Sequence, residues 1–388
     1  MLARELAAQL GTDCAPEPQS TVAGGSTHRF YRWRCASGWL FVKVARSEAL
    51  AQFAAEAQGL TELARADALR VPRVRAQGVA GGHAFLALEW IEAGVTDARS
   101  ERRLGEGLAA LHGVYAEQFG WHIDNTVGPT PQLNGWCGEW AAFWRERRLG
   151  PQLELAVRRG FGRLLEPSGE RLLEALGALL GGHRPHASLL HGDLWAGNWC
   201  TDRGGAPVIF DPAAYYGDRE TDVAMTGLFG GFGRAFYEAY EGAAPLPAGH
   251  AVRAELYNLY HVLNHANLFG GGYAQRARAM MDRLLAEARA CGGSGPGWEG
   301  RSAPGLIFVK VRRRIGGYDL PVVPKIPLHP GHPERICWGC AQFCPADAMR
   351  CGNGTDRAQH PVELWGPDWM NFGLDAQDPP PPPGEVRP

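Results

Sequence analysis

Apolar and polar residues alternate in short segments near the start of the chain and then recur at helical spacing. Residues 30–34 and 39–44 are rich in aromatic and β-branched side chains and predict two strands joined by a turn. Residues 49–65 are rich in alanine and keep their large apolar side chains on one helical face. Another apolar segment, 85–91, predicts a further strand. This part of the chain therefore indicates a small sheet that carries one long helix.

From residue 99 onward the apolar spacing becomes mostly helical. Three further helices are predicted, over residues 168–179, 222–240 and 252–285. The first of them is expected to begin with the Ser168 hydroxyl as its N-terminal cap. Two short apolar segments, 188–190 and 208–210, predict strands that flank a loop. The order of these elements predicts a β-rich lobe that leads into a helical lobe.

The composition of the chain changes near residue 291. Glycine dominates residues 291–300, which is typical of a flexible linker. Five consecutive prolines at 379–383 indicate an extended, disordered end. We therefore divide the chain into a sheet lobe, a helical lobe, a linker, a cysteine-rich module and a tail, at residues 1–92, 93–290, 291–325, 326–373 and 374–388.

Charge and hydropathy argue against two classes of partner. The 388 residues carry a net charge of −2, so no overall positive field favours nucleic acid or an anionic membrane. No apolar run reaches the roughly 18 residues of a membrane-spanning helix. The first ten residues form a poor secretory signal because they include Arg4 and Glu5. We expect a cytoplasmic protein without nucleic-acid or membrane partners.

Lysine is scarce in this chain, which makes each lysine informative. Among 39 basic residues only three are lysines, Lys43, Lys310 and Lys325. Lys43 ends a predicted strand and Glu56 lies in the helix that follows, as expected for a nucleotide-phosphate lysine and its positioning glutamate. A compact ammonium suits that role better than a forked guanidinium. The preceding Gly24 and Gly25 could close over phosphates through backbone N–H groups or equally form a hairpin turn.

Residues 191–198 and the later Asp211 carry the clearest chemical signal. Phosphoryl transfer needs a positioned hydroxyl group and metal ions held by hard oxygen ligands. Asp193 can face the hydroxyl, and Asn198 and Asp211 can hold the metal. Their spacing matches the kinase arrangement of a catalytic-loop Asp, a nearby Asn and a later metal-binding Asp. The alternative is an ordinary loop in which Asp193 is a cap and Asp211 starts a turn.

Together these motifs resemble those of the fructosamine kinase group, whose relatives are the aminoglycoside and choline kinases. The resemblance covers residues 1–288 and is carried by segments 24–26, 41–43, 88–90, 120–125, 128–132, 191–198, 210–222 and 259–269. It implies an α/β (α+β) fold with two lobes, protein-kinase-like and of the aminoglycoside phosphotransferase type, followed here by a small metal-binding module. It also implies ATP-dependent phosphorylation of a sugar hydroxyl on a free or protein-bound ketoamine, a fructosamine or ribulosamine. The phosphorylated adduct would then fall apart, which reverses glycation.

The same resemblance implies a role for each matching residue. Asp193 would be the catalytic base, and Asn198 and Asp211 would bind Mg²⁺. Lys43 would contact the ATP phosphates, and Glu56 would orient Lys43.

Further roles follow from the resemblance at the nucleotide end of the site. The adenine-binding hinge would be the backbone of Glu89, Trp90 and Ile91. Asp222 would brace the catalytic loop by hydrogen bonds. After the glycine pair the family usually has an apolar residue and then Asn, whereas this chain has Thr27 and His28. This departure bears on ATP affinity more than on the type of reaction.

Several polar and aromatic residues are candidates for contact with the acceptor sugar. They are His122, Asp124, Asn125, Trp195, His261 and His265. A loop in which Trp, His and Asp are neighbours is as often a packed, hydrogen-bonded corner. Helix packing explains the two later histidines nearly as well. Trp195 would stack on a sugar ring or be buried against the helical lobe.

Four of the nine cysteines lie close together near the C-terminus, at Cys337, Cys340, Cys344 and Cys351. An odd total in a chain without a secretory signal argues against disulfides, so we interpret the cluster as a metal site. Four thiolates suit Zn²⁺. An iron–sulfur cluster is the alternative, because Cys-Pro after closely spaced cysteines is similar to bacterial ferredoxins. The module also resembles a family of short bacterial proteins of unknown function, and it would serve an unknown partner, act as a redox appendage or be an incidental fusion.

Two other functions stay open at this point. The acceptor could be another small hydroxylated molecule, such as an aminoglycoside or an amino alcohol, and an acidic cluster near the acceptor would favour it. Alternatively, the first 290 residues could be a silent nucleotide-binding module that serves the cysteine cluster. The complete set of Lys43, Asp193, Asn198 and Asp211 argues against a catalytically inactive module, because nucleotide binding alone needs no base opposite the metals.

Overall fold

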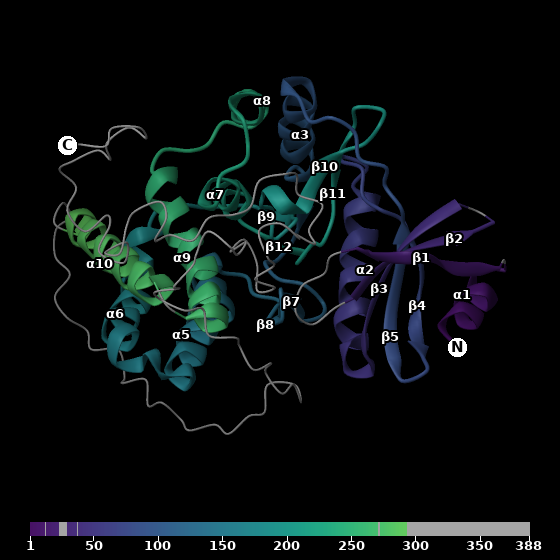
Figure 1. The fold of residues 1–388 in the computed structure, drawn as a ribbon. Coiled ribbons are helices and arrows are strands. Elements are labelled where there is room, and N and C mark those ends of the chain that lie inside the picture. Colours follow the sequence, from purple (N-terminus) through teal and green to yellow (C-terminus); the bar gives the residue numbers. More distant parts are fainter. Residues whose placement is uncertain (12, 23–28, 37, 271, 293–388) are drawn as a thin grey trace, which may run out of the picture.

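The chain folds into two lobes that lie side by side (Figure 1). The computed structural model describes residues 1–292 except residues 12, 23–28, 37 and 271. Gly24 and Gly25 lie outside the described residues, as does the chain from residue 293 onward, which holds the predicted cysteine-rich module with Cys337, Cys340, Cys344 and Cys351.

The N-terminal lobe is built on one antiparallel sheet with the strand order β1-β2-β3-β5-β4. Its elements are α1 (Leu2–Leu10), β1 (Cys14–Val22), β2 (Arg29–Cys35), β3 (Gly38–Arg46), a 3₁₀ turn (Ser47–Ala49), α2 (Leu50–Arg65), β4 (Val74–Ala80) and β5 (His83–Glu89). Successive side chains of β5 point to opposite faces of the sheet. Leu86 and Leu88 pack in the same core as Phe53 of α2. Phe85 packs on the other face in the same core as Leu6 of α1.

The sequence predicted the centre of this sheet better than its edges. The expected strands at 30–34, 39–44 and 85–91 are confirmed as β2, β3 and β5, and the expected helix at 49–65 is confirmed as α2. The two edge strands were not predicted. β1 contains Pro16 and Pro18, which edge strands tolerate and which weaken a strand signal.

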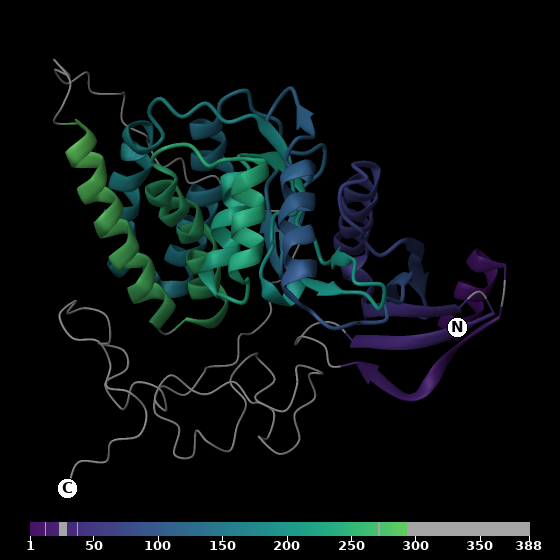
Figure 2. The same ribbon diagram turned by 90° about the horizontal axis from the view of Figure 1, so that it is seen from above.

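The second lobe combines short strands with most of the helices. A three-stranded sheet has the order β12-β9-β6, and β10–β11 and β7–β8 form two hairpins. The strands are β6 (Tyr115–Ala116), β7 (Asn125–Val127), β8 (Thr130–Gln132), β9 (Ala187–Leu190), β10 (Trp199–Thr201), β11 (Pro207–Ile209) and β12 (Tyr215–Gly217). The helices are α3 (Ala98–Leu111), α4 (Trp140–Phe143), α5 (Gly150–Ala156), α6 (Gly162–Leu179), α7 (Glu220–Leu228), α8 (Arg234–Ala243), α9 (His250–Phe269) and α10 (Gly272–Gly292). Figure 2 shows α10 at the end of the molecule away from the N-terminal sheet.

Irregular helical turns connect several of these elements. Two π-helical turns, Trp144–Leu149 and Val157–Phe161, lie on either side of α5, and a 3₁₀ turn, Ala196–Asn198, precedes β10. Wide, π-helical turns next to α-helices are frequent at functional sites.

The predicted cap at Ser168 is wrong. Helix α6 begins at Gly162, and Ser168 lies inside it, where its hydroxyl donates to Asp282 Oδ1 at 3.0 Å. The helix extends upstream because Leu165, about one turn earlier, is fully buried and continues the apolar face.

The two longest predicted helices are each divided in two. Residues 222–240 form α7 and α8, and residues 252–285 form α9 and α10. Glycines with positive φ follow the first helix of each pair, at Gly230, Gly231 and Gly270. A continuous right-handed helix excludes that backbone conformation, so the apolar periodicity alone gave lengths that were too long.

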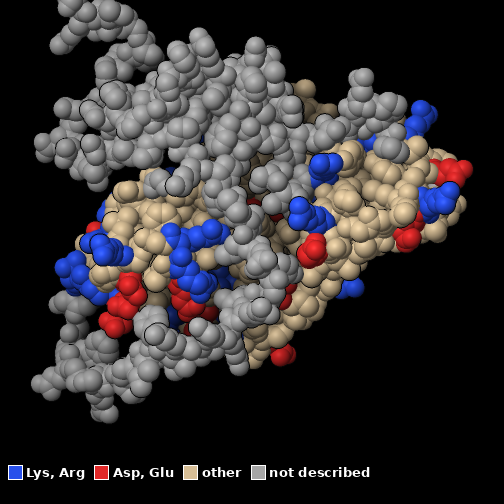
Figure 3. Space-filling model, turned by 60° about the horizontal axis from the view of Figure 1, so that its bottom comes forward, with Lys and Arg blue, Asp and Glu red and all other residues tan. Residues whose placement is uncertain are grey.

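The surface carries both signs of charge. Figure 3 shows acidic and basic side chains close to one another on the face it presents. Ion pairs such as Arg283–Glu255 and Arg234–Glu238 illustrate this mixing. Among the described residues, no helix combines the length and apolar character needed to cross a bilayer.

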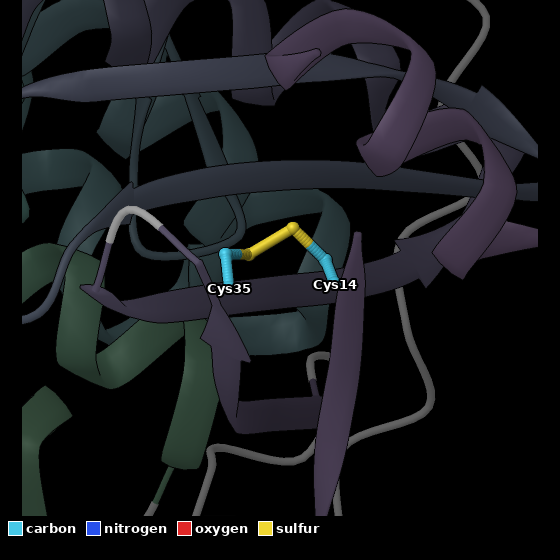
Figure 4. Close-up of a disulfide and its surroundings, with 2 residues drawn as sticks. All are labelled: Cys14 and Cys35. Atoms are coloured by element: carbon cyan, nitrogen blue, oxygen red, sulfur yellow. A yellow bond between two sulfur atoms is a disulfide. The ribbon is translucent and has the colours of Figure 1, made fainter. Parts of the chain in front are cut away.

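Cys14 and Cys35 form a disulfide between β1 and β2 (Figure 4). The argument from the odd cysteine total against disulfides is therefore wrong for these two cysteines. They are register partners in the antiparallel ladder, which brings their side chains together although they are 21 positions apart in the sequence. The odd cysteine total could not reveal this pairing, because it depends on strand register. Cys137 and Cys200 are free thiols.

We predict that the disulfide makes a measurable contribution to the stability of the sheet lobe. Replacing Cys35 by Ser lowers the free energy of unfolding by about 3 kcal/mol, because the bridge restricts the unfolded chain. Denaturant unfolding of wild type and variant without reductant measures this difference. Cys200→Ser serves as the control and should leave the midpoint close to that of wild type. Equal midpoints for Cys35→Ser and wild type would contradict the prediction.

Candidate active site

Lys43 joins the two lobes through a pair of carboxylates. Its ammonium lies 2.7 Å from Glu56 Oε1 on α2 and also contacts Asp211 of the second lobe. Lys43 is only 4% exposed. Burial alone would lower the pKa of Lys43, but the Asp211 and Glu56 carboxylates outweigh burial and raise this pKa. The ammonium is therefore charged and held between the lobes.

The loop that carries Asp193 is fixed by the side chain of Asp222. The backbone N–H groups of His191 and Gly192 donate to the two carboxylate oxygens of Asp222, at 2.7 and 2.8 Å. Gly192 has a φ of 82°, and a Cβ at this position would lie 2.1 Å from the carbonyl oxygen of Ala213. Only glycine allows this approach. The predicted bracing role of Asp222 is thus confirmed.

The Asp222 carboxylate is itself stabilised in its charged form. It is fully enclosed, which would raise its pKa, but hydrogen bonding and charge interaction with His112, together with the backbone N–H of Gly192, lower that pKa overall. Because it stays ionised, the Asp222 carboxylate can accept the hydrogen bonds from His191 and Gly192 at the same time.

Asp193 is poised as a proton acceptor. Burial raises the pKa of Asp193 to about 7, and the neighbouring charges of Asp211 and Asp222 add to the effect. The amide nitrogen of Asn198 donates to the backbone oxygen of Asp193 at 2.8 Å. A carboxyl group with a pKa near neutrality can take up a proton and release it again, as a general base requires.

Asn198 and Asp211 lie at the same end of the β10–β11 hairpin. Trp199 is the register partner of Ile209, and the backbone N–H of Phe210 donates to the carbonyl oxygen of Asn198 at 3.0 Å. The side-chain nitrogen of Asn198 is used by Asp193, so its amide oxygen is the atom left for a cation. One amide oxygen and one carboxylate form a hard donor set that fits Mg²⁺.

The predicted hinge residues lie where β5 leaves the first lobe. They are Glu89, Trp90 and Ile91. Glu89 Oε1 accepts from Arg70 at 2.7 Å, and Arg70 also pairs with Asp202 of the second lobe. The backbone N–H of Trp90 donates to the carbonyl oxygen of Trp39 at 3.2 Å. The segment is therefore tied to both lobes, and its contact with adenine stays a prediction.

The six candidate sugar contacts separate into two groups. Trp195 follows the Asp193 loop and is 40% exposed. His261 Nδ1 lies 4.0 Å from Asp193 Oδ1, and His265 Nδ1 lies 2.8 Å from the carbonyl oxygen of His261. Trp195 and His261 therefore lie beside Asp193, and His265 lies one turn of α9 beyond His261. His265 also packs against the ring of Phe229, which is 40% exposed.

The other group is engaged mainly with the protein itself. His122 Nε2 lies 2.8 Å from Gln58 Oε1, and Asp124 Oδ1 accepts from the backbone N–H of Asn134 at 2.7 Å. Asn125 donates to the carbonyl oxygen of Ala214 at 2.9 Å. These contacts match a packed, hydrogen-bonded corner.

Sequence reasoning missed two buried residues near the site. His112 Nε2 lies 3.3 Å from Asp222 Oδ2. Arg148 has no exposed surface and donates to Asn134 Oδ1 at 2.8 Å. The abundance of arginine hides Arg148 in the sequence, where Arg147 and Leu149 flank it and no pattern marks it.

Comparisons with known proteins agree with this geometry. A family model described as fructosamine kinase matches residues 1–287. A second model, described only as a protein of unknown function, matches residues 322–372. The chain is 44% identical over 285 residues to "Probable ketoamine kinase" of Synechocystis, covering 73% of this chain and 96% of that protein. It is 38% identical to the chloroplastic protein-ribulosamine 3-kinase of Arabidopsis thaliana over 68% of this chain and 82% of that protein.

Solved structures extend the likeness to the fold. A candidate fructosamine-3-kinase from Haemophilus somnus superposes with a TM-score of 0.68 at 29% identity, covering 73% of this chain and 96% of that one. A second, from Thermobifida fusca, gives a TM-score of 0.63 at 32% identity, covering 76% and 99%. A mutant aminoglycoside phosphotransferase solved with ADP and hygromycin B gives 0.51 at 16% identity, covering 76% and 99%, which bears on the fold alone. The expected two-lobed, kinase-like α/β fold is confirmed for residues 1–292.

The raised pKa of Asp193 predicts an acid limb in the pH dependence of phosphoryl transfer. A protonated carboxyl cannot accept a proton, so kcat/KM falls as the pH drops through the pKa of Asp193, which is about 7 before a cation binds. A cation at Asp211 would move the midpoint to lower pH, because it offsets one of the charges that raise this pKa. The pH profile at saturating nucleotide and metal tests this. A flat profile down to the pH at which the chain unfolds would exclude Asp193 as the base.

Proposed function

The chain belongs to the fructosamine kinase family, and we propose that it catalyses ATP-dependent phosphorylation of a sugar hydroxyl on a free or protein-bound ketoamine. A fructosamine or a ribulosamine would be the acceptor. The printed names of its relatives, ketoamine kinase and protein-ribulosamine 3-kinase, support this acceptor class. The phosphorylated adduct would break down afterwards, which would return the amine to its unglycated form.

The observation that carries the proposal is the convergence of three charged groups from separate elements. The Lys43 ammonium of β3, the Asp211 carboxylate after β11 and the Asp193 carboxylate after β9 are near one another. A triphosphate needs a cation from the protein and an acceptor hydroxyl needs a base. Simple nucleotide binding would not call for a half-buried carboxylate with a pKa near neutrality.

In the proposed step Asp193 accepts the proton of the sugar hydroxyl. The hydroxyl oxygen forms a bond to the γ-phosphorus, the bond from that phosphorus to the β–γ bridging oxygen breaks, and ADP leaves with that electron pair. Lys43 would neutralise phosphate charge, and Glu56 would hold Lys43 in place.

Asn198 and Asp211 would hold Mg²⁺ through their side-chain oxygens. Bound there, the ion would offset the negative charge of the phosphates. The backbone of residues 89–91 would meet the adenine ring.

We propose that Trp195, His261 and His265 face the acceptor. Burial lowers the pKa of His261 to about 3, with a further contribution from His265, so the imidazole is neutral at physiological pH. A neutral imidazole beside Asp193 can hydrogen-bond a sugar hydroxyl without adding a positive charge that would suppress the base. The exposed indole of Trp195 offers a flat surface for a sugar ring.

The C-terminal cysteine-rich module would bind Zn²⁺, or an iron–sulfur cluster, through Cys337, Cys340, Cys344 and Cys351. The module would serve an unknown partner, act as a redox appendage or be an incidental fusion, and the kinase chemistry proposed above uses only residues within 1–292. We further propose that the protein works in the cytoplasm.

A panel of acceptors tests the substrate class. With ATP and Mg²⁺, we expect turnover of fructosamine-lysine or ribulosamine-lysine and little turnover of aminoglycosides or amino alcohols. Asp193→Asn should lower kcat by at least about a hundredfold, because it removes the base. Asp282→Asn, which removes a carboxylate on α10, is the matched control and should retain activity. Turnover of another acceptor but of no ketoamine would overturn the proposal.

Metal analysis of the full-length chain tests the cysteine-rich module. We expect bound zinc in a colourless protein, and loss of that zinc in Cys337→Ser/Cys340→Ser because two of four ligands are removed. Visible absorbance with bound iron would identify the cluster alternative. A full-length protein that contains neither metal after anaerobic purification would show that the cysteines are unligated.

A further inference from the structure

A set of buried polar side chains lies beneath the loop that follows Asp211. Its members come from the segment around β7 and β8, from the π-helical turn after α4 and from α9. They are Asn125, Gln132, Asn134, Arg148 and Tyr260, referred to below as the amide network. Gln132, Asn134, Arg148 and Tyr260 are each 3% exposed or less. None of these residues was assigned to phosphate, metal or base chemistry above.

The amide network holds two successive backbone carbonyl groups. Gln132 Nε2 donates to the carbonyl oxygen of Ala213 at 3.1 Å. Asn125 Nδ2 donates to the carbonyl oxygen of Ala214 at 2.9 Å. Both carbonyls belong to the short stretch that connects Asp211 to β12, so the network fixes the position of the backbone just after the carboxylate.

The other polar atoms of Gln132 and Asn125 are themselves held. Tyr260 donates from its hydroxyl to Gln132 Oε1 at 2.9 Å. Asn125 Oδ1 accepts from Gln132 Nε2 at 2.9 Å and from Asn134 Nδ2 at 2.8 Å. These bonds fix which end of each amide points toward the loop, since a flipped amide would place like groups against each other. The two donors to the loop are therefore oriented by their neighbours.

Arg148 anchors the far side of the amide network. Its Nη2 donates to Asn134 Oδ1 at 2.8 Å, and its guanidinium lies 4.0 Å from the ring centre of Tyr215 and 4.6 Å from that of Phe143. In the part of the chain that the structure describes, its partners are amide and carbonyl oxygens and aromatic rings rather than a carboxylate. Burying a charge in this way is costly, so its geometry is strongly constrained.

The loop after Asp211 needs such support because its backbone is strained at Asp211 and closely packed against Gly192 at Ala213. Asp211 has a φ of 55°, in the left-handed region that non-glycine residues rarely adopt. The backbone N–H of Ala213 donates to the carbonyl oxygen of His191 at 2.9 Å, and Gly192 packs directly on the carbonyl of Ala213. Ala213 is thus clamped between the catalytic loop and the amide network.

From these contacts we propose that the amide network positions the Asp211 carboxylate for the metal–nucleotide complex. Its members are positioning residues that act through the Ala213 and Ala214 carbonyls. Asn125 accordingly serves the metal side of the site and not the acceptor sugar. The proposal rests on the proposed function only in taking Asp211 as a metal ligand.

Gln132→Met tests the proposal, because it keeps the length of the side chain and removes both of its polar atoms. Mn²⁺ binding in the presence of a non-hydrolysable ATP analogue, followed by electron paramagnetic resonance, reports on the metal without any acceptor. We expect the Mn²⁺ dissociation constant to rise about tenfold, because the buried hydrogen bond from Gln132 to the Ala213 carbonyl of the Asp211 loop is lost. In kinetics, kcat should fall at limiting Mg²⁺ while the KM for the ketoamine changes little.

Two further variants keep the test decisive. Tyr260→Phe removes a single hydroxyl that orients Gln132, and it should weaken Mn²⁺ binding in the same direction even if Gln132→Met fails to fold. Asn267→Leu removes another buried amide, which bonds to Gln152 at 2.8 Å, and it should lower the melting temperature without changing Mn²⁺ binding.

Three outcomes would overturn the proposal. A higher KM for the ketoamine with unchanged Mn²⁺ binding would assign the network to the sugar. A lower melting temperature alone, with unchanged Mn²⁺ binding well below it, would make the network purely structural. An equal effect of Asn267→Leu on Mn²⁺ binding would show a general loss of packing. Because Mn²⁺ binding needs no acceptor, these outcomes are distinct from a failure of the wild-type protein to phosphorylate ketoamines.

Discussion

The buried ammonium of Lys43 is the interaction on which the arrangement of the two lobes depends. Burying an ammonium group is costly unless carboxylates pair with it, and here one carboxylate comes from each lobe. Glu56 therefore fixes α2 against the sheet, and Asp211 fixes the second lobe against the first. Arg70 provides a second connection between the lobes at the C-terminal end of β5. It pairs with Glu89, the last residue of that strand, and with Asp202 of the second lobe. The positions of Asp193 and Asn198 relative to the first lobe follow from these constraints.

The loops around the site are held by side chains that bind backbone, and the two loops use opposite chemistry. The carboxylate of Asp222 accepts from the N–H groups of the Asp193 loop. The amides of Asn125 and Gln132 donate to the C=O groups of the Asp211 loop. Both clamps are buried, where such hydrogen bonds are strong and an unmatched partner is costly. Loop geometry is thereby set by residues far away in the sequence.

The sequence was most informative where chemistry is local. Residue type and spacing predicted that Lys43, Glu56, Asp193, Asn198 and Asp211 form one site. The structure brings Lys43 into contact with Glu56 and Asp211, and Asn198 into contact with Asp193. The central strands and α2 followed from periodicity. Helix lengths did not, since the breaks at Gly230 and Gly270 depend on backbone conformation rather than on apolar spacing.

Features that depend on tertiary register were out of reach of the sequence. The Cys14–Cys35 pair forms because antiparallel register places the two residues opposite each other. Arg148 lies in no motif, and Tyr260 lies in segment 259–269 without any role assigned to it. Their contacts appear only once α9 and the π-helical turn are brought beside β8. Ser168 seemed a cap because its residue type suits one, whereas a buried Leu165 upstream extends the helix past it.

If Lys43 binds phosphate and Asp211 binds metal as proposed, the contact between them also bears on how a triphosphate would enter. In the resting arrangement the two charges satisfy each other, so an incoming triphosphate competes with a carboxylate for the same ammonium. A triphosphate that arrived alone would leave that carboxylate facing a like charge. Arrival together with a divalent cation allows an exchange of partners, ammonium to phosphate and carboxylate to cation, with no charge left unmatched. With the roles proposed above, this ion pair would discriminate against uncomplexed nucleotide before any chemistry begins.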